Sequence, residues 1–85
     1  MSGSLKQEAT EKAQPLTKLR RHERARIVRI DGQEAQELAG FGLYTGTEIQ
    51  VKQRFPSYIV QTDEAQLALE PAVARRIFVL RLEGG

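Results

Sequence analysis

The side chains that most often perform chemistry in proteins are scarce in this 85-residue chain. It contains no Cys and a single His, His22, which lies between Arg21 and Glu23. Nucleophilic catalysis and Zn or Fe sites use several His, Cys or carboxylate groups that converge on one point, so a lone imidazole is best interpreted as an exposed loop residue. We therefore expect no catalytic residue, no metal site and no cofactor, and we interpret the protein as a non-enzyme.

The serines and the acidic pairs agree with this interpretation. Ser57 lies in an expected turn and the other serines lie near the N-terminus, without the G-x-S-x-G sequence that exposes a nucleophilic serine. The acids Asp63-Glu64, and Glu34 with Glu37, are typical of solvated turns and exposed helix faces. The function is therefore expected to reside in a surface that binds a partner.

Positive charge is concentrated in one part of the sequence. The net charge is +2, but the segment from Lys18 to Arg29 contains six cations and one acid, a local +5 that leaves −3 for the remainder. This run is either a solvated face or a contact for nucleic-acid phosphates or an acidic protein surface. Single-strand binders stack bases on several aromatic side chains, and this chain offers only Tyr44, Phe55 and Tyr58 in or beside turns. No nucleic-acid partner is expected.

Length and composition limit the fold to one small domain. A chain of 85 residues and 9.6 kDa is too short for two ordinary domains, and 40% hydrophobic residues is typical of a globular protein. A small scaffold without disulfides suits a reducing compartment, so a cytoplasmic location is expected. The longest apolar stretch, Ile77 to Leu80, is far shorter than the ~20 residues of a membrane helix.

The pattern along the chain predicts mainly β structure with one short α-helix. Residues 1–14 are polar and are interpreted as a disordered tail, and residues 15–82 as the domain. Alternating or β-branched residues predict five strands, which are residues 24–30, 48–52, 58–62, 66–69 and 77–82. A capping box at Asp31-Gly32-Gln33-Glu34 predicts the start of a helix that ends before Gly42. Five short strands are too few for a sandwich and indicate a small closed barrel, which leaves no free sheet edge.

Two further features of the strands and turns can be predicted. Val28 and Ile30 fall on the opposite face from Ala25 and Ile27, which predicts a bulge or bend in the first strand. The expected core takes the apolar phase of each element and consists of Ala25, Ile27, Leu38, Phe41, Ile49, Val51, Leu67, Leu69, Ile77 and Val79. Gly42 and Gly46 occupy turn positions that favour positive φ.

Several segments together resemble ferrous iron transport protein A, the FeoA family, between Pro15 and Val79. The segment with the most specific resemblance is Phe41-Gly42-Leu43, followed by Gly46-Thr47 and an alternating strand. The others are Pro15-Leu16-Thr17-Lys18-Leu19, Ala25-Arg26-Ile27-Val28-Arg29-Ile30, Leu67-Ala68-Leu69 and Ala74-Arg75-Arg76-Ile77-Phe78-Val79.

The resemblance implies an SH3-like five-stranded β-barrel. It also implies a non-enzymatic cytosolic protein that assists bacterial ferrous-iron uptake by binding the membrane ferrous-iron permease, ferrous iron transport protein B (FeoB), through exposed barrel loops. The same domain is similar to the C-terminal module of metal-dependent repressors of the diphtheria-toxin-repressor type. A metal-responsive regulatory module, with transition-metal or nucleic-acid association, is therefore the alternative.

We expect the permease to contact the loop that follows the helix. Leu43, Tyr44 and Thr45 lie where a barrel loop projects outward, and Tyr is frequent at binding hot spots. Arg24 and Arg26 would steer the approach to an acidic face. The alternative for Tyr44 is that it only caps the end of the barrel.

Two positions depart from the family pattern. His22 stands in the turn before the first strand, where relatives commonly have Gly. The connection Phe55-Pro56-Ser57 is also shorter than the loop that relatives often have between the second and third strands.

Overall fold

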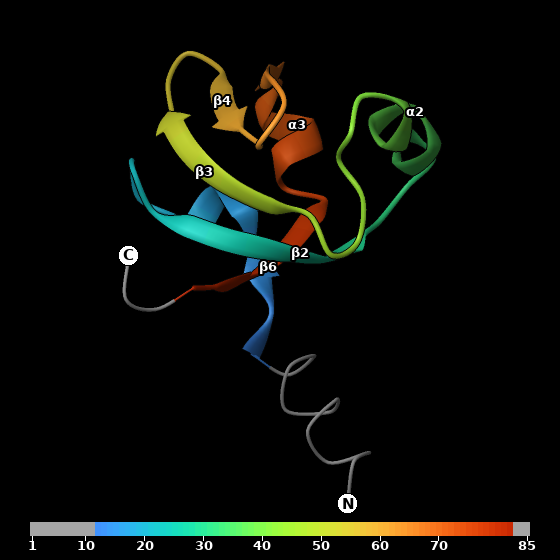
Figure 1. Ribbon diagram of the computed structural model, residues 1–85, viewed down its shortest axis with the longest axis horizontal. Coiled ribbons are helices and arrows are strands. Elements are labelled where there is room, and N and C mark those ends of the chain that lie inside the picture. Colours follow the sequence, from blue (N-terminus) through green and yellow to red (C-terminus); the bar gives the residue numbers. More distant parts are fainter. Residues whose placement is uncertain (1–11, 83–85) are drawn as a thin grey trace, which may run out of the picture.

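The computed structural model of the chain describes residues 12–82 (Figure 1). This range contains six strands and three short helical segments. In chain order they are β1 (Gln14–Pro15), η1 (Leu16–Lys18), β2 (Arg24–Ile30), α2 (Glu34–Gly40), β3 (Glu48–Gln53), β4 (Tyr58–Gln61), β5 (Gln66–Leu69), α3 (Pro71–Ala74) and β6 (Ile77–Arg81). The expected class, mainly β with one short α-helix, is confirmed.

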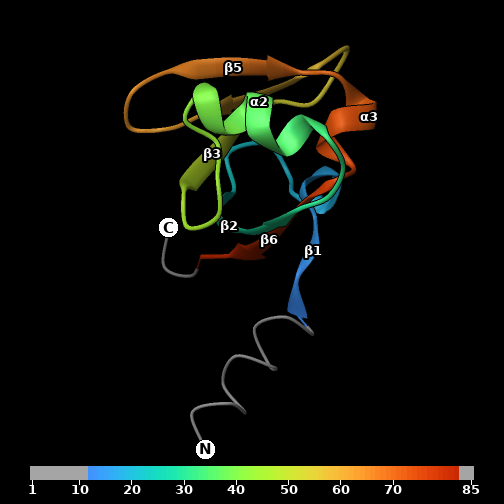
Figure 2. The ribbon, with the colours of Figure 1, turned by 90° about the vertical axis from the view of Figure 1, so that its right-hand side faces the viewer.

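All six strands belong to one antiparallel sheet with the order β1-β6-β2-β3-β4-β5. The sheet bends so that β5 lies across from β2 and β6, and α2 covers the open side between them (Figure 2). No pairing joins the edge strands β1 and β5 within residues 12–82. The sheet is therefore curled but open, and the closed five-stranded barrel is not confirmed. A sixth, two-residue strand supplies one edge, where Gln14 pairs with Val79.

The predicted disordered tail, residues 1–14, lies mostly outside the described residues. Its last residue, Gln14, is in strand β1. The 3₁₀ helix η1 follows β1 directly, and Leu16 at its start and Leu19 just after it are both fully buried. Among residues 12–82, none of the helices has the length and apolar character needed to cross a membrane.

The predicted bulge in β2 is confirmed. Ile27 pairs with Val79 of β6, but the next pair joins Arg29 to Phe78, so Val28 is the extra residue. The bulge changes which side chains face inward. Ala25 and Ile27 are fully buried before it, whereas Val28 and Ile30 are only half-buried. Because a bulge strengthens bending, it helps β2 to curl the sheet around the core.

The exit of α2 is closed by backbone hydrogen bonds around a glycine. Gly42 has φ of 94°, its N–H donates to the carbonyl of Ala39 at 3.0 Å, and the N–H of Leu43 donates to the carbonyl of Leu38 at 2.9 Å. This pair of bonds is the Schellman arrangement, in which the residue after the glycine packs back on the helix. Leu43 is fully buried as a result. The prediction of positive φ at Gly42 and Gly46 is confirmed.

The capping box expected at the start of α2 does not form. The helix begins at Glu34, and Gln33 at its N-cap makes no side-chain hydrogen bond. The Asp31 carboxylate accepts from Arg29 Nε at 2.9 Å, and the Glu34 carboxylate accepts from Arg76 Nη1 at 2.7 Å. Bonds between a carboxylate and a guanidinium join two charged groups, and here they engage both acids of the expected capping box.

The core holds thirteen buried hydrophobic side chains. Eight of the ten expected residues are among them, and Leu67 is half-buried against the cluster. The prediction that Phe41 is a core residue is wrong, because it is 64% exposed. The helix ends at Gly40, so Phe41 leaves the helical phase and Leu43 takes the inward position. The core residues that periodicity missed are Leu16, Leu19, Leu43, Val60 and Ala74.

His22 occupies the turn before β2 with φ of 77°, in the left-handed region that favours Gly. The turn is held tightly by its backbone. The N–H of His22 donates to the carbonyl of Val51 at 2.6 Å, and its own carbonyl accepts from Gln50 Nε2 at 3.0 Å. This conformation gives a physical reason for the Gly that relatives commonly have at this point.

Truncation of Ile49 to Ala should lower the free energy of unfolding by ~2–5 kcal/mol, because the side chain is 2% exposed and its loss leaves a cavity. The matched control is Phe41→Ala, an equally apolar truncation at an exposed site, which should change stability by no more than ~0.5–1 kcal/mol. Urea unfolding followed by circular dichroism measures both. Equal losses in the two variants would show that the assignment of core and surface is wrong.

Replacement of His22 by Gly should raise the free energy of unfolding by about 1 kcal/mol, since Gly removes the cost of a side chain at positive φ. Arg21→Gly is the control, because Arg21 does not have positive φ. At this site Gly relieves no strain and only raises the conformational entropy of the unfolded chain. That variant should be neutral or less stable. A His22→Gly variant that unfolds at lower urea than the parent would contradict the strain at this turn.

Candidate functional site

The groups that perform most chemistry do not converge in the described part of the chain. Within residues 12–82 there is no group of three or more His, Cys, Asp and Glu side chains that could hold a metal ion. His22 lies exposed in its turn, as expected. A candidate site must therefore be sought among the exposed surfaces and hollows.

The basic stretch is largely neutralised where it runs along the sheet. Arg24 Nη2 and Arg26 Nη2 lie 3.5 and 2.9 Å from the two carboxylate oxygens of Glu48 on the neighbouring strand. Arg29 pairs with Asp31, and its guanidinium stacks 4.1 Å from the centre of the Phe78 ring. These are half-exposed pairs on the outer face, so they add little stability and leave a small net positive charge.

Hydrogen bonding also lowers the pKa of two acids near the ends of the sheet. The pKa of the Glu23 carboxyl is lowered first by the backbone N–H of Arg20 and then by Arg81, whose Nε lies 3.1 Å away. The pKa of Glu34 is lowered by its own backbone N–H and by Arg76. Both acids therefore stay charged to a lower pH than a free glutamate does.

The loop that was expected to bind a partner is held by hydrogen bonds and exposes Tyr44 and Thr45. Tyr44 is 55% exposed, and its backbone N–H donates to Thr47 Oγ1 at 3.2 Å, while Thr47 Oγ1 donates to the carbonyl of Gly42 at 3.3 Å. Gly46 N–H donates to the carbonyl of Ile27 at 2.7 Å, which anchors the loop on β2. Tyr44 and Thr45 are thus presented on a preformed turn.

The other predicted contact residues lie in different settings. Leu43 is fully buried, so it supports the loop from inside and offers no surface of its own. Arg24 and Arg26 are exposed on β2, and both bind Glu48. Of the two, Arg26 lies nearer to the loop, because it is opposite Glu48, the first residue of β3, whereas Arg24 is opposite Gln50.

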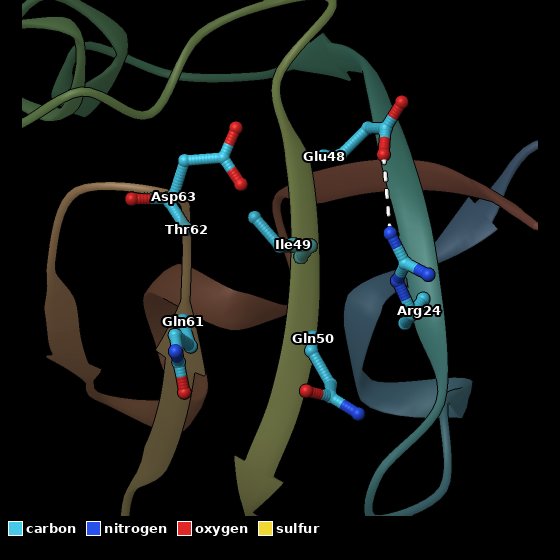
Figure 3. A pocket seen from close by; sticks show the side chains of 7 residues that line it. All are labelled: Arg24, Glu48, Ile49, Gln50, Gln61, Thr62 and Asp63. Atoms are coloured by element: carbon cyan, nitrogen blue, oxygen red, sulfur yellow. Dashed lines mark hydrogen bonds and ion pairs between the residues drawn. The ribbon is translucent and has the colours of Figure 1, made fainter. Parts of the chain in front are cut away.

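A polar hollow of about 320 Å³ lies between β2, β3 and the β4–β5 turn (Figure 3). Arg24 reaches from β2 to Glu48 on β3, while Gln61 and Asp63 come from β4 and the turn that follows it. Two carboxylates and one guanidinium share this space, and no His or Cys lines it. The hollow therefore offers charged and amide groups that can form hydrogen bonds.

A second, more apolar groove of about 280 Å³ separates α2 from β5 and α3. Its apolar wall includes Leu38, Phe41, Leu67 and Val73, and Glu37 and Glu70 stand at its rim. This groove was not predicted, because Phe41 and Leu67 were both expected to lie in the core. The available signal was Gly40 and Gly42 on either side of Phe41, which ends the helix there.

The third exposed aromatic residue lies at the other end of the molecule. Phe55 is 84% exposed in the loop between β3 and β4, whereas Phe41 and Tyr44 follow α2. The β3–β4 loop and α2 lie on opposite sides in Figure 1, and α2 lies at the front in Figure 2. The exposed aromatics therefore form two separate surfaces.

Known structures with the same fold include iron-transport proteins and repressors. A crystal structure of an iron uptake regulatory protein (FeoA) is 28% identical with a TM-score of 0.74, and the match covers 82% of this chain and 97% of that one. Iron(II) transport protein A from Clostridium thermocellum is 27% identical with a TM-score of 0.73, over 82% of this chain and 46% of that one. A manganese-dependent transcriptional repressor is 25% identical with a TM-score of 0.75, over 82% of this chain but 37% of the repressor.

A search of curated proteins finds no match to this chain. The family model of the FeoA domain, however, matches residues 14–81, which include every strand of the sheet. That match spans four fifths of the sequence and agrees with the resemblance carried by Phe41-Gly42-Leu43 and the strand after it. The chain therefore belongs to the FeoA domain family.

Proposed function

We propose that this protein is a non-enzymatic, cytosolic accessory protein of bacterial ferrous-iron uptake that binds the cytoplasmic region of the membrane ferrous-iron permease. The match of the FeoA domain model to residues 14–81 carries this proposal. It is supported by the chemistry of the surface, because the side chains of the described residues form hollows and exposed patches instead of a catalytic constellation.

The contact surface in this proposal is the α2-exit surface, which we define as Phe41, Tyr44 and Thr45. Phe41 and Tyr44 are both more than half exposed and flank the buried Leu43. The Schellman closure and the hydrogen bonds of Thr47 hold their backbone in place. Aromatic side chains on a preorganised loop lose little conformational entropy on binding, which is typical of hot-spot residues.

Arg24 and Arg26 would act at longer range in this complex. Both guanidiniums share the single carboxylate of Glu48, so the group retains a net positive charge of one. A charge at the edge of an interface mainly accelerates association and is screened by salt. The two arginines are therefore proposed to orient the protein toward an acidic face of the permease.

Combined replacement of Tyr44 by Ala and Thr45 by Glu should weaken binding to the purified cytoplasmic region of the permease by at least about tenfold, and Phe41→Ala should do so as well. Isothermal titration calorimetry measures the affinity, and circular dichroism checks the fold. Phe55→Ala is the matched control, because it removes an equally exposed aromatic from the other end. Unaltered affinity in the folded Tyr44 and Phe41 variants would exclude this surface.

A regulatory module is the second candidate function, and the likeness to the manganese-dependent repressor favours it. This chain spans only 37% of that repressor, so the rest of the repressor has no counterpart in the matched region. DNA-binding repressors place a recognition helix in the major groove, and the helices of residues 12–82 have at most seven residues. A gel-shift assay with operator-length DNA and Mn²⁺ or Fe²⁺ separates the two functions.

Metal binding by the purified protein is expected to be weak. Tight transition-metal sites need convergent His, Cys or carboxylate ligands, and no such group of three occurs in the described range. Titration with Fe²⁺ under anaerobic conditions, and with Zn²⁺, should give no stoichiometric sub-micromolar site. A tight site that survives His22→Ala would contradict this expectation and would favour the regulatory module.

A further inference from the structure

The end of the molecule opposite α2 is held together by hydrogen bonds between segments distant in sequence. Arg54 Nη2 in the β3–β4 loop donates to the carbonyl of Thr17 in η1 at 3.1 Å. The η1–β2 loop is joined to β3 by the hydrogen bond between His22 N–H and the carbonyl of Val51. Segments almost forty residues apart in sequence thus form one continuous end of the protein, at the left in Figure 1.

The cations at this end differ from those on the sheet. Lys18, Arg20, Arg21 and Arg54 are exposed, and within residues 12–82 none of them forms an ion pair. By contrast, all three arginines of β2 have an acidic partner on the same or a neighbouring segment. The one carboxylate described in the η1–β2 loop, Glu23, is occupied by Arg81.

Phe55 lies in the same β3–β4 loop as Arg54, at this end of the molecule. It follows Arg54 directly, precedes Pro56 and is the most exposed large hydrophobic side chain of the described residues, at 84%. We name Lys18, Arg20, Arg21, Arg54 and Phe55 the basic end. An exposed apolar ring at the same end as four exposed cations that form no ion pair within residues 12–82 combines the two attractions that hold peripheral proteins on anionic membranes.

We propose that the basic end binds the surface of an anionic phospholipid bilayer. The four cations would lie against phosphate groups of the headgroup layer, and the Phe55 ring would enter the boundary between headgroups and acyl chains. A nucleic-acid strand fits less well, because base stacking uses several aromatic side chains and the basic end offers one. The inference does not depend on the proposed function, since it uses residues outside the α2-exit surface.

The chain contains no Trp, so single replacements provide local fluorescence reporters. Phe55→Trp places one indole in the basic end, and Phe41→Trp places one at an exposed site near α2. Both variants are mixed with vesicles of phosphatidylcholine, with or without about one third phosphatidylglycerol. We expect a blue shift of emission for Phe55→Trp with the anionic vesicles only, and no shift for Phe41→Trp. The shift should disappear near 1 M salt, where the Debye length is about 3 Å.

Vesicle flotation of further variants measures how much the cations and the Phe55 ring each contribute to membrane binding. Combined replacement of Arg20 and Arg21 by Gln should weaken partitioning into anionic vesicles by roughly 25-fold, at about fivefold for each cation. Phe55→Ala should weaken it roughly fivefold. Tyr44→Ala should leave vesicle binding unaltered, and Phe55→Ala should leave permease binding unaltered, so the two proposals fail or succeed separately.

Three outcomes would overturn the proposal. In the first, the parent protein does not partition into anionic vesicles. In the second, the emission of Phe41→Trp shifts to the blue and that of Phe55→Trp does not. In the third, Phe55→Trp binds a single-stranded oligonucleotide more tightly than vesicles at equal phosphate concentration. The third result would assign the basic end to nucleic acid.

Discussion

The structure depends on β2, which is the longest strand, with seven residues, and pairs with both β6 and β3. The backbone of Ile27 also accepts from Gly46 and donates to Thr47, so the loop after α2 is fixed to the same strand. Side chains alternate between the two faces of β2, so Ala25 and Ile27 point into the core and the neighbouring side chains point to solvent. The exposed residues of this strand are the arginines Arg24, Arg26 and Arg29. One strand therefore places the core, the loop and the charged face together.

The bulge at Val28 has consequences beyond β2. It lets the sheet curl enough for a chain of this size to cover thirteen buried side chains, although β1 and β5 do not pair. Small domains bury a smaller fraction of their surface than large ones, so a curled sheet is an efficient way to enclose a core. The gap at the open side is covered by α2, of which only Leu38 is buried. The groove beside Phe41 follows from this loose coverage.

Ion pairing divides the positive charge of the chain into two parts with different properties. The three arginines of β2 pair with two carboxylates, Glu48 and Asp31, and keep a net charge of one, whereas the loop cations at the basic end have no such partners among the described residues. The sequence shows only one continuous run from Lys18 to Arg29. Pairing across strands, which sequence spacing does not reveal, decides which of these charges are available to a partner.

Local patterns in the sequence determined the class of fold, the bounds of β2, the bulge, the two glycine turns and most of the core, because these features depend on residues close together in the chain. They also carried the resemblance that the family model confirms. Only the tertiary structure decided that Phe41 is exposed while Leu43 is buried, that Glu34 binds Arg76 instead of closing a capping box, and that Arg54 binds Thr17 of η1. The partners of Glu34 and Arg54 lie 42 and 37 residues away in sequence, so a local pattern does not contain them and they are known only once the chain is folded.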